Sequence, residues 1–419
     1  MTRPDETPVE TRVALLQLAG RLLLTYNVRT HQLRERLQSL AHTLGLSVQV
    51  SIAYRSLNIF VADGPILHAQ TAELRINVAI AARVLSILDA IETGGVDVAE
   101  GLRRLQEAES TAERHPRWIL AVIFGLAASA LAALLSADAA GMTVIGISSA
   151  LGLLLRQEMG KRHMMLLSLP FSAAFVGSVL GGIVILMEWT STPGICLIVP
   201  ALMLVPGPHL INGLYDTLEN HLQTGMARLF LALGILLSAA LGIFLGAWLV
   251  LGATVVPPWH GSAQAIPLWL DVVLAGMASC GFGAFYNAPW RVLWTSILCG
   301  MVGHGVRYVS LAEGLSLPLS TLLACLAIGC MGAIISRRLR VPFAAVAFAG
   351  AVPMMPGVLF FQSFGGAMQI AMAGRGADLV LISQTFSGLL QALLVVGAMG
   401  LGLLLGAAPV SRLPGLAAR

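Results

Sequence analysis

The feature that most constrains this chain is a series of long, uncharged apolar runs that follows Trp118. The run from Leu229 to Leu251, for example, contains no Asp, Glu, Lys or Arg. Hydrophobic residues make up 57% of the chain and charged ones 11%, whereas a soluble domain carries about 25% charged residues. A chain this apolar cannot cover a water-facing surface with polar groups, so lipid must surround most of it. The sequence therefore predicts a polytopic α-helical membrane protein.

The charged residues concentrate near the N-terminus, and we expect residues 1–116 to form a small cytoplasmic α+β domain. The segment 47–63 alternates in polarity and is rich in β-branched residues, which predicts one or two strands closed by the turn Asp63-Gly64-Pro65. This part has neither a Walker A loop nor a dinucleotide-binding glycine loop, so a regulatory or gating role is expected. The predicted helices are 13–26, 30–44, 69–92 and 97–113.

The rest of the chain predicts ten membrane spans in two groups of five. The first group occupies 117–252, a periplasmic linker follows at 253–265, and the second group occupies 266–419. The second and fourth segments are short for a hydrocarbon core of about 30 Å, and we expect them to be tilted, discontinuous or flanked by a locally thinned bilayer. The segments are 118–136, 141–155, 165–187, 193–206 and 226–252, then 266–286, 291–309, 316–335, 341–361 and 378–406.

Positive charges predict the orientation, because cytoplasmic loops carry an excess of Lys and Arg. The groups that include Arg117, Arg156 and Arg337 fall on one side under this count. This places both termini in the cytoplasm of a bacterial inner membrane. Arg307 and Arg375 fall near the outer side, where they either line a pathway or mark misplaced boundaries.

The two halves of the membrane part resemble each other. Leu169-Pro170-Phe171-Ser172 is echoed by Leu317-Pro318-Leu319-Ser320, and Val205-Pro206-Gly207 is echoed by Pro356-Gly357. The matched positions lie about 150 residues apart throughout, as an internal repeat requires. Each half holds an odd number of predicted spans, so the second half must be inverted relative to the first. The expected fold is therefore two inverted five-helix repeats behind the N-terminal domain.

The repeated Pro-Gly pairs predict a break in one helix of each half. Proline lacks an N–H group and glycine tolerates unusual dihedral angles, so the helix is interrupted at Pro206-Gly207 and at Pro356-Gly357. A break exposes a helix N-terminus, whose partial positive charge suits a carboxylate. Paired breaks in matching segments point to a transport site near the midplane of the membrane. The alternative is an ordinary kink in a packed bundle.

Polar residues cluster directly after the first break. His209, Asn212 and Asp216 are spaced three and four residues apart, so a helix places them on one face. A carboxylate inside a membrane is costly and is a functional hypothesis by default, and Asp216 is a candidate proton carrier. The alternative is that this helix lies at the cytoplasmic interface and that its polar side chains are hydrated.

The second half offers its own polar candidates. His304 and Arg307 lie within one helical turn, and an arginine beside a cavity suits carboxylate recognition. The alternative for Arg307 is a charge that reaches the outer interface. Gln362, Ser363 and Gln369 follow the second break and are candidate counterparts of the polar residues in the first half.

A set of short motifs also runs in order along nearly the whole chain. The motifs are His115-Pro116-Arg117-Trp118, Leu204 to Asp216 with Thr224-Gly225 and Arg228 behind it, Asn287-Ala288-Pro289, Gly303-His304-Gly305, and Val352 to Gly357. Together they resemble the threonine/serine exporter (ThrE) family, and more closely its split relatives, the YjjP and YjjB pair, joined in one chain. The N-terminal domain departs from the family at Asn27-Val28-Arg29-Thr30, where an acid is common, so a role for that acid does not carry over.

The resemblance implies export of a small hydrophilic metabolite driven by the proton gradient. Threonine or serine is the first expectation, and succinate or another dicarboxylate is the alternative. An uncoupled channel is a further alternative. An intramembrane enzyme or sensor would need a nucleophile or a metal cluster at depth, and the five cysteines have no metal-ligand spacing. We expect no cofactor, no metal and no nucleic-acid partner, and leave a homo-oligomer open.

Overall fold

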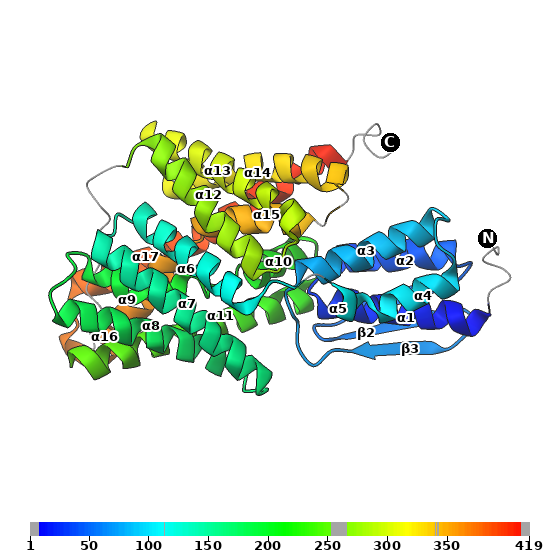
Figure 1. Ribbon diagram of the computed structural model, residues 1–419, viewed down its shortest axis with the longest axis horizontal. Helices are drawn as coiled ribbons and strands as arrows, with labels where there is room; N and C mark the ends of the chain where they lie inside the picture. Colours follow the sequence, from blue (N-terminus) through cyan, green and yellow to red (C-terminus); the bar gives the residue numbers. More distant parts are fainter. Residues whose placement is uncertain (1–7, 113, 253–265, 340, 342, 412–419) are drawn as a thin grey trace.

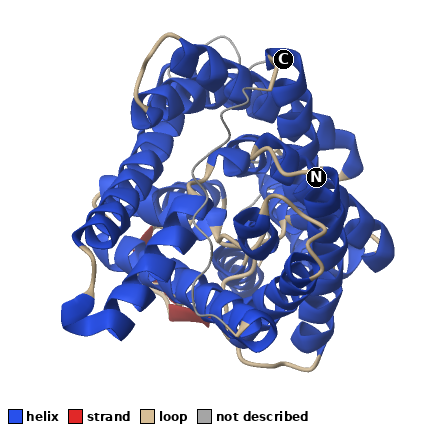
Figure 2. Ribbon diagram, turned by 90° about the vertical axis from the view of Figure 1, so that its left-hand side faces the viewer, coloured by secondary structure: helices blue, strands red, loops and turns tan. Residues whose placement is uncertain are grey.

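The computed structural model describes residues 8–112, 114–252, 266–339, 341 and 343–411, and the predicted linker lies outside them. Figure 1 shows an N-terminal domain at one end of a larger bundle of helices. Viewed from the opposite end, in Figure 2, the bundle is built of helices, and the strands lie behind it. Strands are therefore confined to the N-terminal domain in the described part of the chain.

The N-terminal domain packs helices on one face of a small sheet. Its three strands form an antiparallel meander in the order β1-β2-β3, with Ile59 opposite both Val50 and Leu67. Leu57, Ile59 and Leu67 are buried against the helices. The elements are α1 (Val9–Thr25), α2 (Thr30–Thr43), β1 (Val48–Ile52), β2 (Ser56–Val61), β3 (Ile66–Gln70), α3 (Val78–Glu92), α4 (Val98–Gln106) and α5 (Ala108–Thr111).

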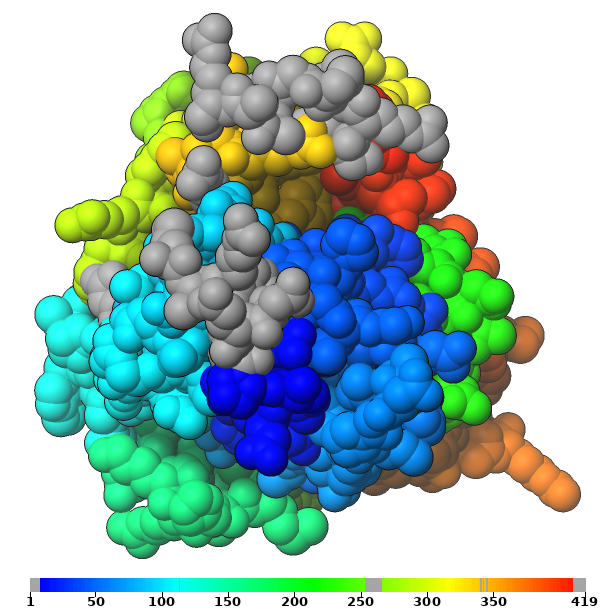
Figure 3. Space-filling view, turned by 90° about the vertical axis from the view of Figure 1, so that its right-hand side faces the viewer, coloured from blue at the N-terminus to red at the C-terminus, as the bar shows by residue number. Residues whose placement is uncertain are grey.

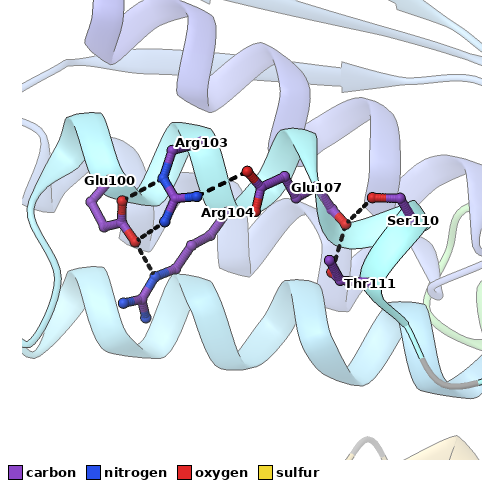
Figure 4. A network of polar contacts seen from close by, with 6 residues as sticks. All are labelled: Glu100, Arg103, Arg104, Glu107, Ser110 and Thr111. Carbon is purple, nitrogen blue, oxygen red and sulfur yellow. Dashed lines mark hydrogen bonds and ion pairs between the residues drawn. The ribbon is translucent and has the colours of Figure 1, made fainter.

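Two predicted helices of this domain have different bounds. The helix expected from residue 69 begins only at Val78, because Ile66–Gln70 pairs with β2 as a third strand and Asn77 caps α3 by accepting the N–H of Ile80. The helix expected over 97–113 is divided at Glu107, whose carbonyl oxygen accepts the hydroxyl groups of the next turn. Figure 4 shows this turn and the exposed ion pairs of α4.

The membrane part contains ten elements that correspond to the ten predicted segments, two of them bent pairs. The first half comprises α6 (Arg117–Leu134), α7 (Ala139–Lys161), α8 (Ser168–Leu186), the pair α9 (Pro193–Leu202) and α10 (Gly207–Leu218), and α11 (Leu222–Leu251). The second half comprises α12 (Leu268–Phe285), α13 (Trp290–Ala312), α14 (Leu317–Leu339), the pair α15 (Phe343–Ala351) and α16 (Gly357–Ala373), and α17 (Leu379–Ser411), with 3₁₀ turns η2 (Val352–Met354) and η3 (Gly374–Gly376) flanking α16.

Seven of the described helices are long and apolar enough to cross a membrane, or nine spans when each bent pair counts as one. The one predicted span that is not among these nine is α13. It has 23 residues, which is about 34 Å of helix, but it is less apolar than the others. Ten spans therefore remain a prediction. The expectation that the second segment is short is wrong, because α7 extends to 23 residues. The fourth segment is discontinuous, as predicted.

The outer surface of the bundle fits a lipid environment. Its exposed side chains are largely Leu, Ile, Val and Phe, with Phe230 and Phe386 more than 60% exposed. Exposed tryptophans lie at both ends of the helices: Trp118 and Trp290 toward the N-terminal domain, Trp189 and Trp269 at the opposite end. Tryptophan is enriched at both membrane–water interfaces, so these two groups are consistent with a bilayer between them.

The same packing order recurs in the two halves. The first half packs α6 on α7, α7 on α8 and α8 on α11, and the second half packs α12 on α13, α13 on α14 and α14 on α17. Contacts between the halves are reciprocal as well: α6 packs on α12, α10 on α17 and α16 on α11. The turn after α6 has a positive φ at Ser136, and the turn after α12 has one at Asn287, 151 residues later. The two halves are therefore similar in local backbone and in packing.

Candidate functional site

The two Pro-Gly breaks have nearly the same backbone conformation. Pro206 has φ −80° and ψ 61°, and Pro356 has φ −79° and ψ 47°. The N–H group of Gly207 donates to the carbonyl oxygen two residues before it at 2.8 Å, and that of Gly357 does the same at 2.8 Å. The helices bend by 62° at the first break and by 48° at the second. The predicted interruption of both helices is confirmed.

The two breaks also pack against each other. A Cβ atom on Gly207 would lie 3.0 Å from Val352 Cγ2, and one on Gly357 would lie 2.7 Å from Leu202 Cδ2. Val352 follows Leu202 by 150 residues, just as Gly357 follows Gly207. The contact between the two breaks is thus reciprocal. Glycine permits this close approach because it has no side chain.

A cavity of about 500 Å³ lies between the first break and the N-terminal domain. We call it the domain-side cavity. Pro206, His209 and Arg156 line it from the membrane part, and Tyr26 and Asn77 line it from the domain. His209 is 6% exposed, and its Nδ1 atom has no hydrogen-bond partner among the residues that the structure describes. Figure 3 shows the domain, in blue, covering much of this end of the bundle.

A second cavity, of about 360 Å³, lies beside the second break and away from the domain. We call it the far-side cavity. Pro356, His304, Arg307 and Asp271 line it. His304 Nδ1 lies 3.0 Å from an oxygen of Asp271, and both side chains are largely buried. Predicted residues His304, Arg307 and Pro356 are thus brought together. Asp271 of α12 joins them, because it contacts His304 of α13 and lines the same cavity.

The membrane part contributes one guanidinium group to the lining of each cavity. Arg156 on α7 and Arg307 on α13 are 151 residues apart, at equivalent places in the two halves. Within the described residues, neither guanidinium group donates a hydrogen bond or forms an ion pair of 4 Å or less. The buried Nε of Arg307 has no hydrogen-bond partner there. The predicted end of the second segment at residue 155 is wrong, because α7 continues to Lys161 and includes Arg156. The repeat spacing from Arg307 was the signal that could have found it.

Asp216 and Asn212 face the N-terminal domain rather than either cavity's arginine. Asp216 is 0% exposed, forms an ion pair with Arg228, and accepts hydrogen bonds from the N–H group of Thr30 at 3.0 Å and from its hydroxyl at 2.9 Å. Asn212 donates to the carbonyl oxygen of Asn27 at 2.9 Å. The hydrated alternative therefore does not apply to Asp216. The loop 27–30 binds directly to α10 and α11.

The remaining candidates lie on α16. Ser363 is buried with an unpaired hydroxyl, while Gln362 and Gln369 are partly exposed. None of the three is among the residues that line the two cavities. Gln362 follows Asn212 by 150 residues, so its position matches the repeat, whereas the position equivalent to Asp216 is Gly366. A role for these three residues in transport stays a prediction.

Electrostatics at the domain-side cavity are set partly by Tyr26. Its hydroxyl donates to Glu109 Oε1 at 2.6 Å. Burial raises the pKa of Tyr26 well above its usual value, and the bond to Glu109 raises it further. The phenol therefore stays neutral at physiological pH and adds no negative charge to the cavity.

Comparison with known protein families agrees with this architecture. The ThrE family model, of threonine/serine exporters, matches residues 14–250. A second model, described as Threonine/Serine exporter, ThrE, matches residues 271–408. No solved structure matches the chain. The two models together cover most of the N-terminal domain and both halves of the bundle, so the chain belongs to the threonine/serine exporter (ThrE) family, with both family regions joined in one polypeptide.

Proposed function

We propose that this protein is a secondary active exporter of threonine and serine that is driven by the proton gradient. The observation that carries the proposal is the pair of separate cavities, one on each side of the contact between the breaks. A transporter must expose its site to one side of the membrane at a time. Two cavities separated by packed, interrupted helices suit that requirement.

The reciprocal contact between the breaks suggests how exposure alternates. Inverted repeats exchange conformations, so that the arrangement of one half becomes that of the other and the open side changes. The two breaks here have similar dihedral angles and equivalent neighbours, so each half has a counterpart to the moving parts of the other. In this proposal the bent pairs α9–α10 and α15–α16 rock against each other about their common contact.

The chemistry of the far-side cavity suits an amino acid and a proton. Arg307 offers a cation for the carboxylate, and Asp271 offers an acceptor for the ammonium group. The His304–Asp271 pair, at 3.0 Å, is a titratable site that opens into the same cavity. We propose that a proton entering from this side binds that pair, and that its binding releases the ammonium group of the substrate.

The proposed orientation has the domain end in the cytoplasm of a bacterial inner membrane. Arg117, Lys161 and Arg338 lie at the helix ends nearest the N-terminal domain, and positive residues favour the cytoplasmic face. The last described turn of α17 lies toward the same end in Figure 1. Both ends of the chain are then cytoplasmic, and the domain-side cavity receives the exported solute.

A dicarboxylate is the second candidate substrate. The domain-side cavity is lined by Arg75, Arg114 and Arg156 against a single acid, Glu73. This surplus of positive charge favours a substrate with two carboxylates over a zwitterion. The Arg75–Glu73 ion pair, at 2.7 Å, removes part of that surplus, so the amino acid remains the first candidate.

The test is counterflow in proteoliposomes loaded in turn with threonine, serine and succinate, with and without an imposed pH gradient. Saturable uptake of labelled threonine or serine that follows the gradient is expected. Uptake of succinate alone would assign the dicarboxylate, and flux that neither saturates nor responds to the gradient would indicate a channel. His304→Gln should reduce the response to the pH gradient while leaving exchange at equal pH in place, and an unchanged response would remove the pair from the proton path.

A further inference from the structure

We propose that Arg156 binds the carboxylate of the substrate in the domain-side cavity and that Arg307 does the same in the far-side cavity. The protein would then offer one equivalent anion subsite at each end of its path. This inference rests on the proposed export function and deepens it, because it names the residue that first holds the solute. In the sequence, Arg156 served only as a positive charge that indicates orientation, and none of the polar motifs includes this residue.

The first support is the unsatisfied donor capacity of Arg156. A guanidinium has five N–H donors in a planar fork that matches a carboxylate. Among the described residues, Arg156 makes a cation–π contact with Phe285, whose ring centroid lies 5.1 Å from the guanidinium carbon. No protein carboxylate or carbonyl group accepts its protons in that part of the chain. A cation is costly at membrane depth, so this one is poised for an acceptor supplied by a ligand.

The second support is the polar groups that share the cavity. Tyr286 Oη and His209 Nδ1 are both buried and have no hydrogen-bond partner in the described part of the chain, and both residues line the cavity with Arg156. The hydroxyl of Tyr286 also lies beside the first break, 3.4 Å from where a Cβ on Gly207 would be. A carboxylate bound to Arg156 could therefore accept further hydrogen bonds at the end of the cavity that borders the break.

The third support is the equivalence of the two arginines. α7 and α13 hold equivalent places in the packing order of the two halves, and Arg156 and Arg307 lie 151 residues apart on them. Arg307 has a buried Nε without a hydrogen-bond partner among the described residues, and it lines a cavity beside its own break. A charge that merely reached toward an interface would not need a counterpart in a second cavity on the opposite side of the contact.

The charged surroundings of the two sites differ in one respect. Asp271, paired with His304, lies in the cavity of Arg307, whereas Phe285 and the neutral phenol of Tyr26 lie in the cavity of Arg156. The Glu73 carboxylate that also lines the domain-side cavity is held by Arg75. We expect the domain side to bind the carboxylate more tightly and the far side to release it, which is the direction that export requires.

The experiment measures uptake of labelled threonine in two sets of oriented membrane vesicles. The domain side of the protein faces outward in one set and inward in the other. Arg156→Gln should raise the KM for threonine presented at the domain side by about 10- to 100-fold, the loss of hydrogen bonds to a charged group. Arg307→Gln should raise the KM at the far side instead. Arg156→Lys keeps the charge but not the fork, and should fall between wild type and Arg156→Gln.

The matched control is Arg162→Gln. Arg162 follows Arg156 by six residues, is 73% exposed and pairs with Glu158 at the surface. Its variant should keep the wild-type KM on both sides. The inference would be overturned if folded Arg156→Gln kept a domain-side KM within about threefold of wild type. A change that small is less than the loss of one hydrogen bond to a charged group would cause.

A second readout separates this inference from the proposed function. If wild-type protein transports no threonine, the function has failed, and the subsite is tested by phenylglyoxal modification of arginines in wild-type protein, mapped by mass spectrometry. Protection of Arg156 but not of Arg162 by threonine or succinate would support the subsite without any transport. Equal modification of Arg156 with and without both carboxylates would overturn it.

Discussion

Replacing Asp216 by alanine should release the N-terminal domain from the bundle. The side chains of Asp216 and Arg228 are 0% and 1% exposed, and they form a direct ion pair. Asp216 also accepts both donors of Thr30, and Arg228 donates to the carbonyl oxygen of Val28 at 3.0 Å. Two chain segments nearly 200 residues apart are thus joined by one buried carboxylate.

The expected magnitude follows from the burial. Removing one partner of a buried ion pair leaves the other charge uncompensated and costs about 3–5 kcal/mol. This free energy destabilises the state in which the loop 27–30 is bound to the bundle, because Thr30 loses its hydrogen-bond acceptor at the same time. An equilibrium shift of 3 kcal/mol corresponds to a factor of roughly 100 or more in the population of the undocked loop.

Amide hydrogen exchange measures this population directly. The N–H group of Thr30 donates to Asp216, so its exchange should accelerate by about two orders of magnitude in Asp216→Ala. The double variant Asp216→Leu with Arg228→Met should recover part of the protection, since it leaves no uncompensated charge, although Thr30 still lacks its acceptor.

The control is Glu219→Ala. Glu219 pairs with Arg29 of the same loop at 3.4 Å, but both side chains are partly exposed, at 20% and 33%. Such pairs contribute about 0–1 kcal/mol, so exchange at Thr30 should change by less than about fivefold. Exchange in Asp216→Ala that matches this control would refute the reasoning that the buried carboxylate holds the domain.

Three further predictions concern coupling, packing and pH. If Asp216 carries a proton, Asp216→Asn ends proton-driven threonine counterflow in protein that is still inserted, and unchanged counterflow would remove it from the proton path. Gly242→Ala should lower the free energy of unfolding by about 1–3 kcal/mol or more, because its Cβ would lie 2.3 Å from a backbone carbonyl oxygen of α8. The apparent Tm in detergent should fall for this variant and stay unchanged for Gly397→Ala, whose Cβ would meet open space. Hydrogen bonds from Arg103, then Arg104, lower the pKa of Glu100 to about 2 from its ordinary 4.5 (Figure 4). The stabilising effect of the Glu100 carboxylate is therefore complete above pH 4.5 and is lost as the pH falls toward 2. NMR titration of Arg103→Ala should show a higher pKa for Glu100, and an unchanged pKa would contradict this.

Local chemistry made the interrupted helices predictable. Pro206-Gly207 and Pro356-Gly357 break a helix wherever they stand, because the missing N–H group and the missing side chain belong to the residues themselves. The spacing of 150 residues between them likewise needs no structure to be read. The sequence alone therefore led to the breaks, to their equivalence and to the family.

Other features depended on which segments meet in space. Ile66–Gln70 became a strand because β2 lies beside it, and short apolar segments of that kind are compatible with either helix or strand. Asp271 and His304 are 33 residues apart in the sequence, and they pair because α12 packs on α13.

By itself, then, the sequence determined a helical membrane protein with a repeated break, since apolar run length and Pro-Gly chemistry act along the chain. Only the tertiary structure decided what the charged residues face. Asp216 contacts Thr30 across 186 residues, and Arg156 lines a cavity although its neighbours in sequence resemble a cytoplasmic loop. The physical reason is that a charge in a membrane protein takes its role from the groups that replace water around it, and those groups come from distant segments.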